Sequence, residues 1–120
     1  MSINQILKKM VDNVQGGLGA IVMGYDGISI DEYLKEEAEI DVPLVAVEYS
    51  AVLKEINKTL AVLKIGKMEE VSISTDFLRI LVRAINDDLF VVLAIINEGN
   101  YGKGRYLLKL HTPELRECLE

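Results

Sequence analysis

The sequence contains very few of the residues that build covalent or metal-bound sites. Among its 120 residues are one cysteine and one histidine. The chain also has only two prolines and no tryptophan. The lone Cys118 cannot form an internal disulfide, and His111 with Cys118 cannot complete a zinc site, which needs at least three protein ligands. On one helix, a separation of seven residues would place the two about 10 Å apart, outside hydrogen-bond reach. We therefore expect structural or surface roles for both side chains.

Long apolar runs and a secretory leader are also missing. No apolar run approaches the ~18 residues of a membrane span. The N-terminal MSINQILKKM has polar breaks every three or four residues and no small-residue cleavage site. With the single cysteine, these features predict a cytoplasmic protein that does not insert into membranes. The net charge of −6 argues against sequence-independent nucleic-acid binding, which rests on neutralising phosphates.

What the chain does have is apolar content suited to a compact core. Hydrophobic residues make up 50% of the sequence, which excludes a disordered chain. The length fits one domain and is sufficient to bury a core. We found no internal repeat and no low-complexity tract, so we expect a single domain over residues 1–120.

The segment LGAIVMGYDGISIDEYL, Leu18 to Leu34, predicts two strands, 18–25 and 28–34, joined by a turn. Asp26-Gly27 between apolar runs favours a type I′ hairpin turn, because both residues tolerate positive φ. The preceding Gly16-Gly17 pair invites a nucleotide-loop interpretation. That interpretation fails, because a dinucleotide fingerprint places its glycines between a strand and a helix, and no Gly-Lys-Ser/Thr follows.

Two amphipathic helices are predicted in the first half of the chain. Apolar residues at helical spacing indicate a helix over 2–15, ended by Gly16-Gly17. A polar connector spans 35–43. Within it, Asp41 lies just before Pro43 and resembles a helix start. A long helix over 43–65 then ends before Gly66. One of its apolar stripes should cover a sheet, namely Val45, Tyr49, Val52, Ile56, Leu60 and Leu63.

A second apolar ridge on this long helix is harder to explain. It lies about 120° from the first and is interleaved with charged residues. Either it widens the face that covers the core, or it packs on another chain. Its members are Leu44, Val47, Ala51 and Val62.

Three strands and a last helix are expected in the second half. Strand 69–75 alternates apolar and polar residues, whereas 77–85 and 89–97 are apolar at nearly every position, as in strands covered on both faces. A last amphipathic helix from near Arg105 should be disturbed at Pro113; its expected apolar residues are Tyr106, Leu107, Leu110, Leu115 and Leu119. The resulting order, α-β-β-α-β-β-β-α, predicts an α+β fold whose antiparallel sheet carries helices on both faces.

No constellation of residues supports an enzyme or a bound cofactor. The acidic cluster lacks the central glycine of a calcium loop, so we interpret it as a solvated edge that could steer a basic partner. Arg79 and Arg83 share a strand face with apolar neighbours, which suggests the sheet end or a partner surface. The acidic cluster comprises Asp31, Glu32, Glu36, Glu37, Glu39 and Asp41.

The chain resembles the roadblock/dynein-light-chain superfamily, and most of all its bacterial single-domain members of the MglB type. The matching stretches are GLGAIVMGYDGISI, the long helix 43–65 and EEVSISTDFLRILVRAINDDLFVVLAI. NEGNYGKGRYLLKL is similar to the family's Asn-x-Gly-x-x-Arg pattern through Asn100, Gly102 and Arg105. The resemblance implies a five-stranded antiparallel sheet between one long helix and two terminal helices.

The resemblance also implies a homodimer that joins edge strands into one continuous sheet and sets the long helices side by side. On this basis we expect an open edge at strand 69–75, which invites pairing. The expected dimer contacts are Val47, Ala51, Lys54, Lys58, Val62, Val71 and Ile73.

MglB-type members bind a small Ras-like GTPase and stimulate its hydrolysis, and others of the superfamily act as adaptors or dynein subunits. We therefore expect a non-enzymatic regulator or adaptor that contacts a GTPase through Glu48, Glu55 and Lys58. No arginine finger is expected, since Arg79 and Arg83 lie mid-strand and Arg105 and Arg116 lie on the terminal helix. The alternative is a small-ligand sensor of the PAS or profilin-like kind, which should hold a pocket with converging polar groups.

Overall fold

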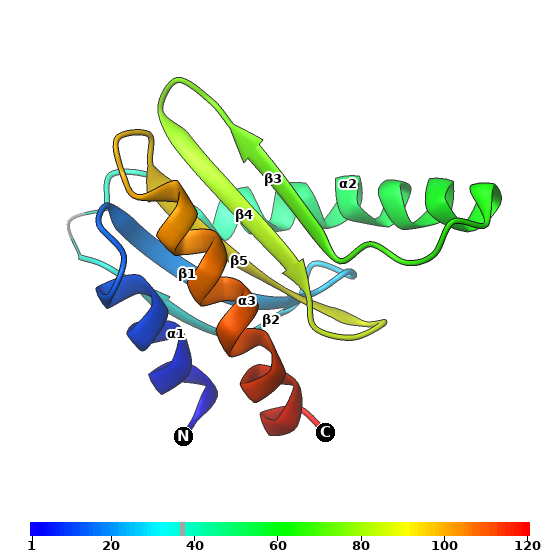
Figure 1. Ribbon diagram of the computed structural model, residues 1–120, viewed down its shortest axis with the longest axis horizontal. Helices are drawn as coiled ribbons and strands as arrows, with labels where there is room; N and C mark the ends of the chain where they lie inside the picture. Colours follow the sequence, from blue (N-terminus) through cyan, green and yellow to red (C-terminus); the bar gives the residue numbers. More distant parts are fainter. Residues whose placement is uncertain (37) are drawn as a thin grey trace.

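The computed structural model describes residues 1–36 and 38–120. Its helices and strands follow the predicted order and confirm the α+β class (Figure 1). The elements are α1 (Ile3–Asp12), β1 (Gly17–Gly24), β2 (Ser29–Leu34), α2 (Val42–Leu63), β3 (Glu70–Ser74), β4 (Leu78–Ala84), β5 (Leu89–Ile96) and α3 (Tyr101–Cys118).

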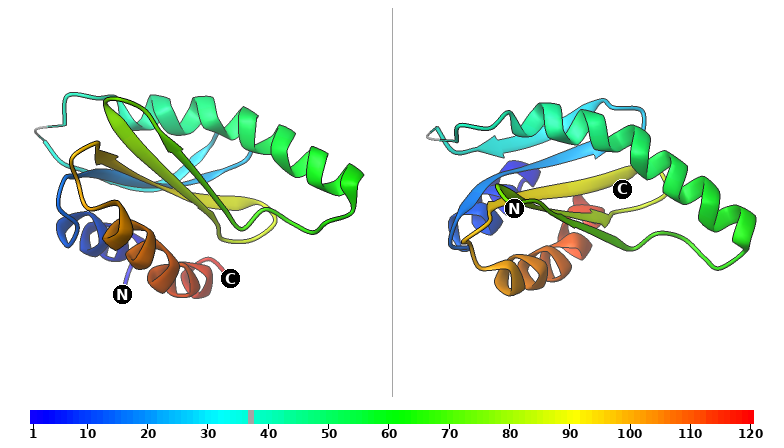
Figure 2. Two further views of the ribbon diagram at one scale, coloured as in Figure 1. Left: turned by 45° about the horizontal axis from the view of Figure 1, so that its top comes forward. Right: turned by 90° about the horizontal axis from the view of Figure 1, so that it is seen from above.

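The five strands form one antiparallel sheet in the order β2-β1-β5-β4-β3. α2 covers one face, and α1 with α3 covers the other (Figure 2). The sheet between one long helix and two terminal helices, implied by the family resemblance, is therefore confirmed. β2 and β3 are the two edges of the sheet.

The central strands supply the core on both faces. Side chains alternate across a strand, so Val22 and Leu93 pack toward α1 and α3, while Ile21 and Phe90 pack toward α2. All four are fully buried. This two-sided burial explains why the strands over 77–85 and 89–97 are apolar at nearly every position.

The first hairpin is confirmed, but its turn type differs from the prediction. Gly27 has φ +85°, whereas Asp26 does not adopt positive φ. The Gly27 amide donates to the Gly24 carbonyl at 2.9 Å, and the Gly24 amide donates to the Ile28 carbonyl at 2.9 Å. These bonds define a three-residue loop in which a type I turn precedes a left-handed glycine. The type I′ prediction was wrong because only Gly27 needs the left-handed region.

α1 is shorter than predicted. It starts with a capping box between Ser2 and Gln5 and ends at Asp12, with Asn13 as its C-cap. Gly16, at φ +82°, turns the chain directly into β1. The glycine pair therefore starts the sheet instead of capping the helix.

α2 starts where the sequence predicts, and most of its predicted core stripe covers the sheet. The Asp41 carboxylate accepts a hydrogen bond from the Leu44 amide at 3.1 Å, which makes Asp41 the N-cap. Four residues of the predicted core stripe are partly buried against the α2-side core, namely Val45, Tyr49, Ile56 and Leu60, whereas Val52 and Leu63 are 47% and 58% exposed. The buried positions are Val42, Ala46, Ser50 and Leu53. The prediction was wrong only for Val52 and Leu63, because α2 is apolar around much of its circumference and the helical period alone does not mark where the covered face ends.

α3 begins at Tyr101, earlier than predicted, and Pro113 does not interrupt it. Proline cannot donate to the carbonyl one turn earlier, yet the buried Leu108 and Leu115 on either side pack on the same core and keep the helix continuous. Tyr106 and Leu110, two of the apolar residues that indicated this helix, are 59% and 48% exposed.

Candidate interaction surfaces

α2 exposes more apolar surface than an ordinary surface helix. Of the second ridge, Leu44, Val47 and Val62 are 54%, 43% and 77% exposed, and Ala51 is also exposed. The interpretation of this ridge as a wide core face is therefore wrong. Because a soluble protein rarely leaves a contiguous apolar patch open without a partner, the ridge is a candidate contact with another chain.

The C-terminal half of α2 also extends past the edge of the sheet beyond β3 (Figure 1). The helix ends at Lys64, which adopts a left-handed conformation with φ 56°. Its two neighbours in the sequence, Leu63 and Ile65, are 58% and 67% exposed. This end of the helix therefore leaves apolar side chains without contacts to the sheet, a feature that the sequence pattern did not reveal.

The free edge of β3 lies beside this overhang. The Thr75 amide donates to the Leu78 carbonyl at 2.7 Å, and the Ala84 amide donates to the Glu69 carbonyl at 2.9 Å. In an antiparallel ladder the hydrogen-bonded pairs alternate, so the odd-numbered residues of β3 bond to β4. The backbone groups of Glu70, Ser72 and Ser74 consequently point away from the sheet, open to another strand.

The residues predicted to form the dimer contact all lie on α2 and β3. Val47, Ala51, Lys54, Lys58 and Val62 are exposed on α2, and Val71 and Ile73 of β3 are half-buried. Val71 contacts the α2-side core. The structure brings the two groups to one side of the molecule, because α2 passes over the face of the sheet that Val71 occupies. Their role in a dimer stays a prediction.

The predicted partner-binding residues Glu48, Glu55 and Lys58 are exposed on α2. Within residues 1–36 and 38–120, none of them takes part in an ion pair. Their charges are therefore directed to solvent and available to another protein.

The arginines lie on the opposite face of the sheet and form a network that the sequence did not predict. The Glu70 carboxylate accepts from Arg105 Nη2 at 2.6 Å and from Arg83 Nη1 at 3.4 Å. The hydrogen bonds and charge of Glu70 raise the pKa of Arg105 above its ordinary value. Arg79 donates to Ser74 Oγ at 2.9 Å, and the Ser72 and Tyr101 hydroxyls are 2.7 Å apart. The network thus joins β3, β4 and the start of α3.

His111 and Cys118 have the structural or surface positions that were expected. His111 is 3% exposed, and its Nδ1 lies 3.1 Å from Glu114 Oε1. Cys118 is exposed, with Sγ 3.3 Å from the Met1 carbonyl oxygen. In the part of the chain that the structure describes, no three histidine, cysteine or acidic side chains are placed to share a metal ion.

Most of the acidic edge is exposed to solvent, as expected. Asp31 is half-buried and accepts from Asn4 Nδ2 at 3.4 Å, whereas Glu32, Glu39 and Asp41 are exposed. Glu36 is also exposed, and Glu37 lies outside the described residues. Asp41 is committed to capping α2.

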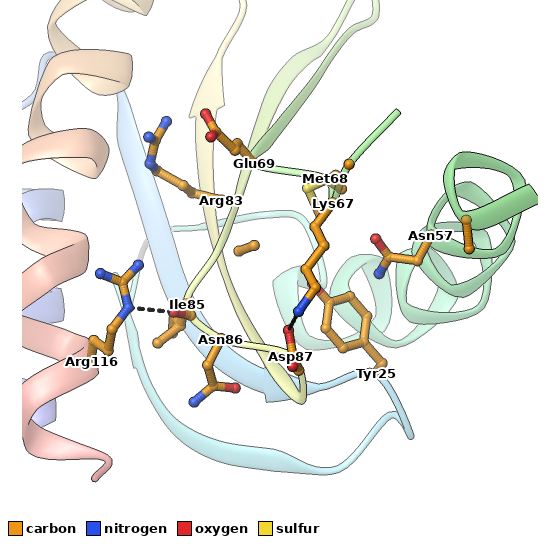
Figure 3. A pocket seen from close by; sticks show the side chains of 13 residues that line it. Tyr25, Asn57, Lys67, Met68, Glu69, Arg83, Ile85, Asn86, Asp87 and Arg116 are labelled. Carbon is orange, nitrogen blue, oxygen red and sulfur yellow. Dashed lines mark hydrogen bonds and ion pairs between the residues drawn. The ribbon is translucent and has the colours of Figure 1, made fainter. Parts of the chain in front are cut away.

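An open cleft of about 510 Å³ lies at one end of the sheet (Figure 3). Tyr25 and Asn57 line it on the α2 side, and Arg83 and Arg116 line it on the α3 side. Burial raises the pKa of the Tyr25 hydroxyl. Lys67 crosses the cleft to bond Asp87 at 2.7 Å. Met68 of the α2-side apolar cluster and Ile85 of the α3-side cluster also line the cleft, which therefore borders both clusters.

Solved structures share this arrangement over nearly the whole chain. MglC from Myxococcus xanthus is 39% identical, with 98% of each chain covered and a TM-score of 0.71. The chain belongs to the roadblock/LC7 family. A roadblock/LC7 domain from Streptomyces avermitilis has the same fold at 12% identity and a TM-score of 0.84, covering 99% of this chain and 98% of that one.

A structure described as MglB with a tetrameric arrangement also shares the fold, at 13% identity and a TM-score of 0.84. It covers 95% of this chain and 85% of that one. The roadblock family assignment made from the sequence is confirmed. No model of a protein family and no curated protein matches the sequence. Among the described residues, no helix combines the length and apolar character needed to cross a bilayer.

Proposed function

We propose that this roadblock protein is a homodimeric, non-enzymatic regulator or adaptor that binds a small Ras-like GTPase. The observation that carries the proposal is the 39% identity with MglC over 98% of both chains. The resemblance to MglB-type proteins supplies the kind of partner, because such proteins bind Ras-like GTPases. The cytoplasm, where such GTPases act, is the compartment expected from the single cysteine.

Self-association is supported by two surfaces on the same side of the molecule. The free edge of β3 offers unpaired backbone groups, and edge strands are natural pairing sites. The overhanging end of α2 offers Val62, Leu63 and Ile65, all more than half exposed. A second copy that extends the sheet at β3 would lie beneath this overhang and cover both surfaces. The tetrameric arrangement of MglB further supports self-association within the fold.

The α2 surface is the proposed GTPase contact. Glu48, Glu55 and Lys58 point into solvent on the helix that faces away from α1 and α3. The four arginines belong to β4 and α3, and Arg83 and Arg105 are already bound to Glu70. A GTPase docked on α2 would therefore be activated, if at all, by positioning of its own catalytic loop and not by an arginine finger.

Binding and single-turnover GTP hydrolysis, measured with each purified Ras-like GTPase of the source genome, test this proposal. Glu48→Lys and Glu55→Lys, which lie outside the expected dimer contacts, should weaken binding, whereas Lys103→Glu on the opposite face should leave it unchanged. Each arginine-to-alanine variant should keep hydrolysis within about a hundredfold of the original protein, below the effect of a lost arginine finger. Absence of binding to every GTPase, or equal weakening by Lys103→Glu, would refute the assignment.

The packing of the interior supports this proposal over the sensor alternative. The interior between the sheet and the helices is filled by two apolar clusters, one on each face. Within residues 1–36 and 38–120, every buried side-chain nitrogen or oxygen has a hydrogen-bond partner. A ligand-binding sensor should instead direct unpaired polar groups into an internal pocket.

A further inference from the structure

All four arginines of the chain lie on one side of the molecule. Arg79 and Arg83 project from β4 on the face that α3 covers, and Arg105 and Arg116 belong to α3 itself. We call these four residues the arginine surface. The nine lysines are spread over the rest of the sequence, from Lys8 to Lys109. Arginine is therefore concentrated where β4 and α3 meet, although the protein as a whole carries a net charge of −6.

Contacts connect the members of the arginine surface into one continuous strip. The Arg79 and Arg105 guanidinium groups lie 5.7 Å and 5.9 Å from the centre of the Tyr101 ring. Glu70 then joins Arg105 to Arg83. Arg83 and Arg116 line the same cleft at the end of the sheet (Figure 3). Arg116 is oriented by its Nε, which donates to the Ile85 carbonyl at 2.6 Å.

Among the described residues, ion pairs balance only part of the positive charge of this strip. Glu70 is the one carboxylate that pairs with these arginines among residues 1–36 and 38–120. Arg79 and Arg116 pair with no carboxylate in the same ranges. Glu69 and Asp87 also line the cleft, but Asp87 is bound to Lys67. Two oriented guanidinium groups therefore keep free donors at the two ends of the strip.

We propose that the arginine surface binds an acidic, extended segment of a partner protein. Guanidinium groups hold carboxylates through paired, charge-assisted hydrogen bonds, and arginine suits such contacts better than lysine. Alternating carboxylates along a segment would meet Arg79 at one end of the strip and Arg116 at the other. The surrounding negative charge of the protein disfavours long polyanions and anionic membranes, which would extend beyond the strip. This site lies on the opposite face from the proposed GTPase contact and would give the protein a second partner.

A direct test uses a fluorescein-labelled peptide in which glutamate alternates with glycine, and a matched peptide with glutamine in place of glutamate. Fluorescence anisotropy should show binding of the glutamate peptide, with an affinity that falls as salt is added. Arg79→Gln with Arg116→Gln should weaken binding by about tenfold or more, since hydrogen bonds to charged groups are among the stronger ones. The charge-matched control, Lys9→Gln with Lys64→Gln, should bind as the original protein does.

A second pair of variants separates charge from geometry. Arg79→Lys with Arg116→Lys keeps both charges but loses the paired donors, so it should recover only part of the affinity. Circular dichroism melting curves identify variants that fold like the original protein, and only these are compared. Equal binding of the two peptides, or equal weakening by the lysine control, would overturn the proposal. Tighter binding to phosphatidylserine vesicles or to an oligothymidylate than to the glutamate peptide would overturn the assignment of a protein partner. None of these outcomes depends on a GTPase.

Discussion

A proline at position 72 tests whether the free edge of β3 joins two copies. The backbone N–H of Ser72 points away from β4 and lies at the middle of the three outward-facing residues of β3. Proline lacks this donor but is tolerated on an edge strand when its nitrogen faces outward. The ladder between β3 and β4 should therefore survive in Ser72→Pro, while an added strand would lose a hydrogen bond.

The size of the effect follows from the symmetry of a dimer. An acceptor left unsatisfied by a missing donor costs about 1–3 kcal/mol. In a two-fold contact the change is present in both strands, so the dimer should lose about 2–6 kcal/mol. This corresponds to a dissociation constant weakened roughly 30-fold to 10⁴-fold.

Sedimentation equilibrium over a range of concentrations measures this change, and two controls isolate it. Ser72→Ala removes the hydroxyl that contacts Tyr101 but keeps the backbone donor, so it should dimerise like the original protein. Ile73→Pro removes a donor to β4 and should instead lower the melting temperature. A monomeric original protein, or a Ser72→Pro variant with an unchanged dissociation constant, would refute pairing through β3.

Three further predictions concern the helices. Ala51→Arg places a charge at the proposed contact between the two α2 helices and should cost several kcal/mol of dimer stability; a dimer of unchanged affinity in sedimentation would place the contact elsewhere. Gly104→Ala should lower the free energy of unfolding by about 1–3 kcal/mol, because the added Cβ would overlap the buried Ile95 side chain. The space around Gly102 is open, so Gly102→Ala should raise the free energy of unfolding by about 0.5–1 kcal/mol. A urea titration in which both variants shift alike would contradict this packing. Asp41→Ala removes the N-cap of α2 and should cost about 1 kcal/mol in the same titration; an unchanged midpoint would show that the cap does not stabilise the helix.

Most of the fold could be predicted because its signals are local. Apolar runs in the central strands, glycine-containing turns and the Asp41 cap depend on neighbours in the sequence, and each was found within a few residues of its predicted place. The errors also have local causes. Both residues of the Asp26-Gly27 pair accept positive φ, but the loop needs positive φ only at Gly27. The proline rule was overridden in α3 by packing on both sides of Pro113.

The candidate sites could be predicted only in part. The sequence by itself determined that α2 carries more apolar surface than one sheet can cover, since two ridges of helical spacing are visible in it. Only the tertiary structure decided which ridge is buried, because both fit the helical period and the choice depends on where the sheet lies. The open edge of β3 follows from the strand order, which no local pattern encodes. The arginine surface likewise exists because α3 returns across β4 and brings Arg105 beside Arg79 and Arg83, residues that the sequence keeps apart.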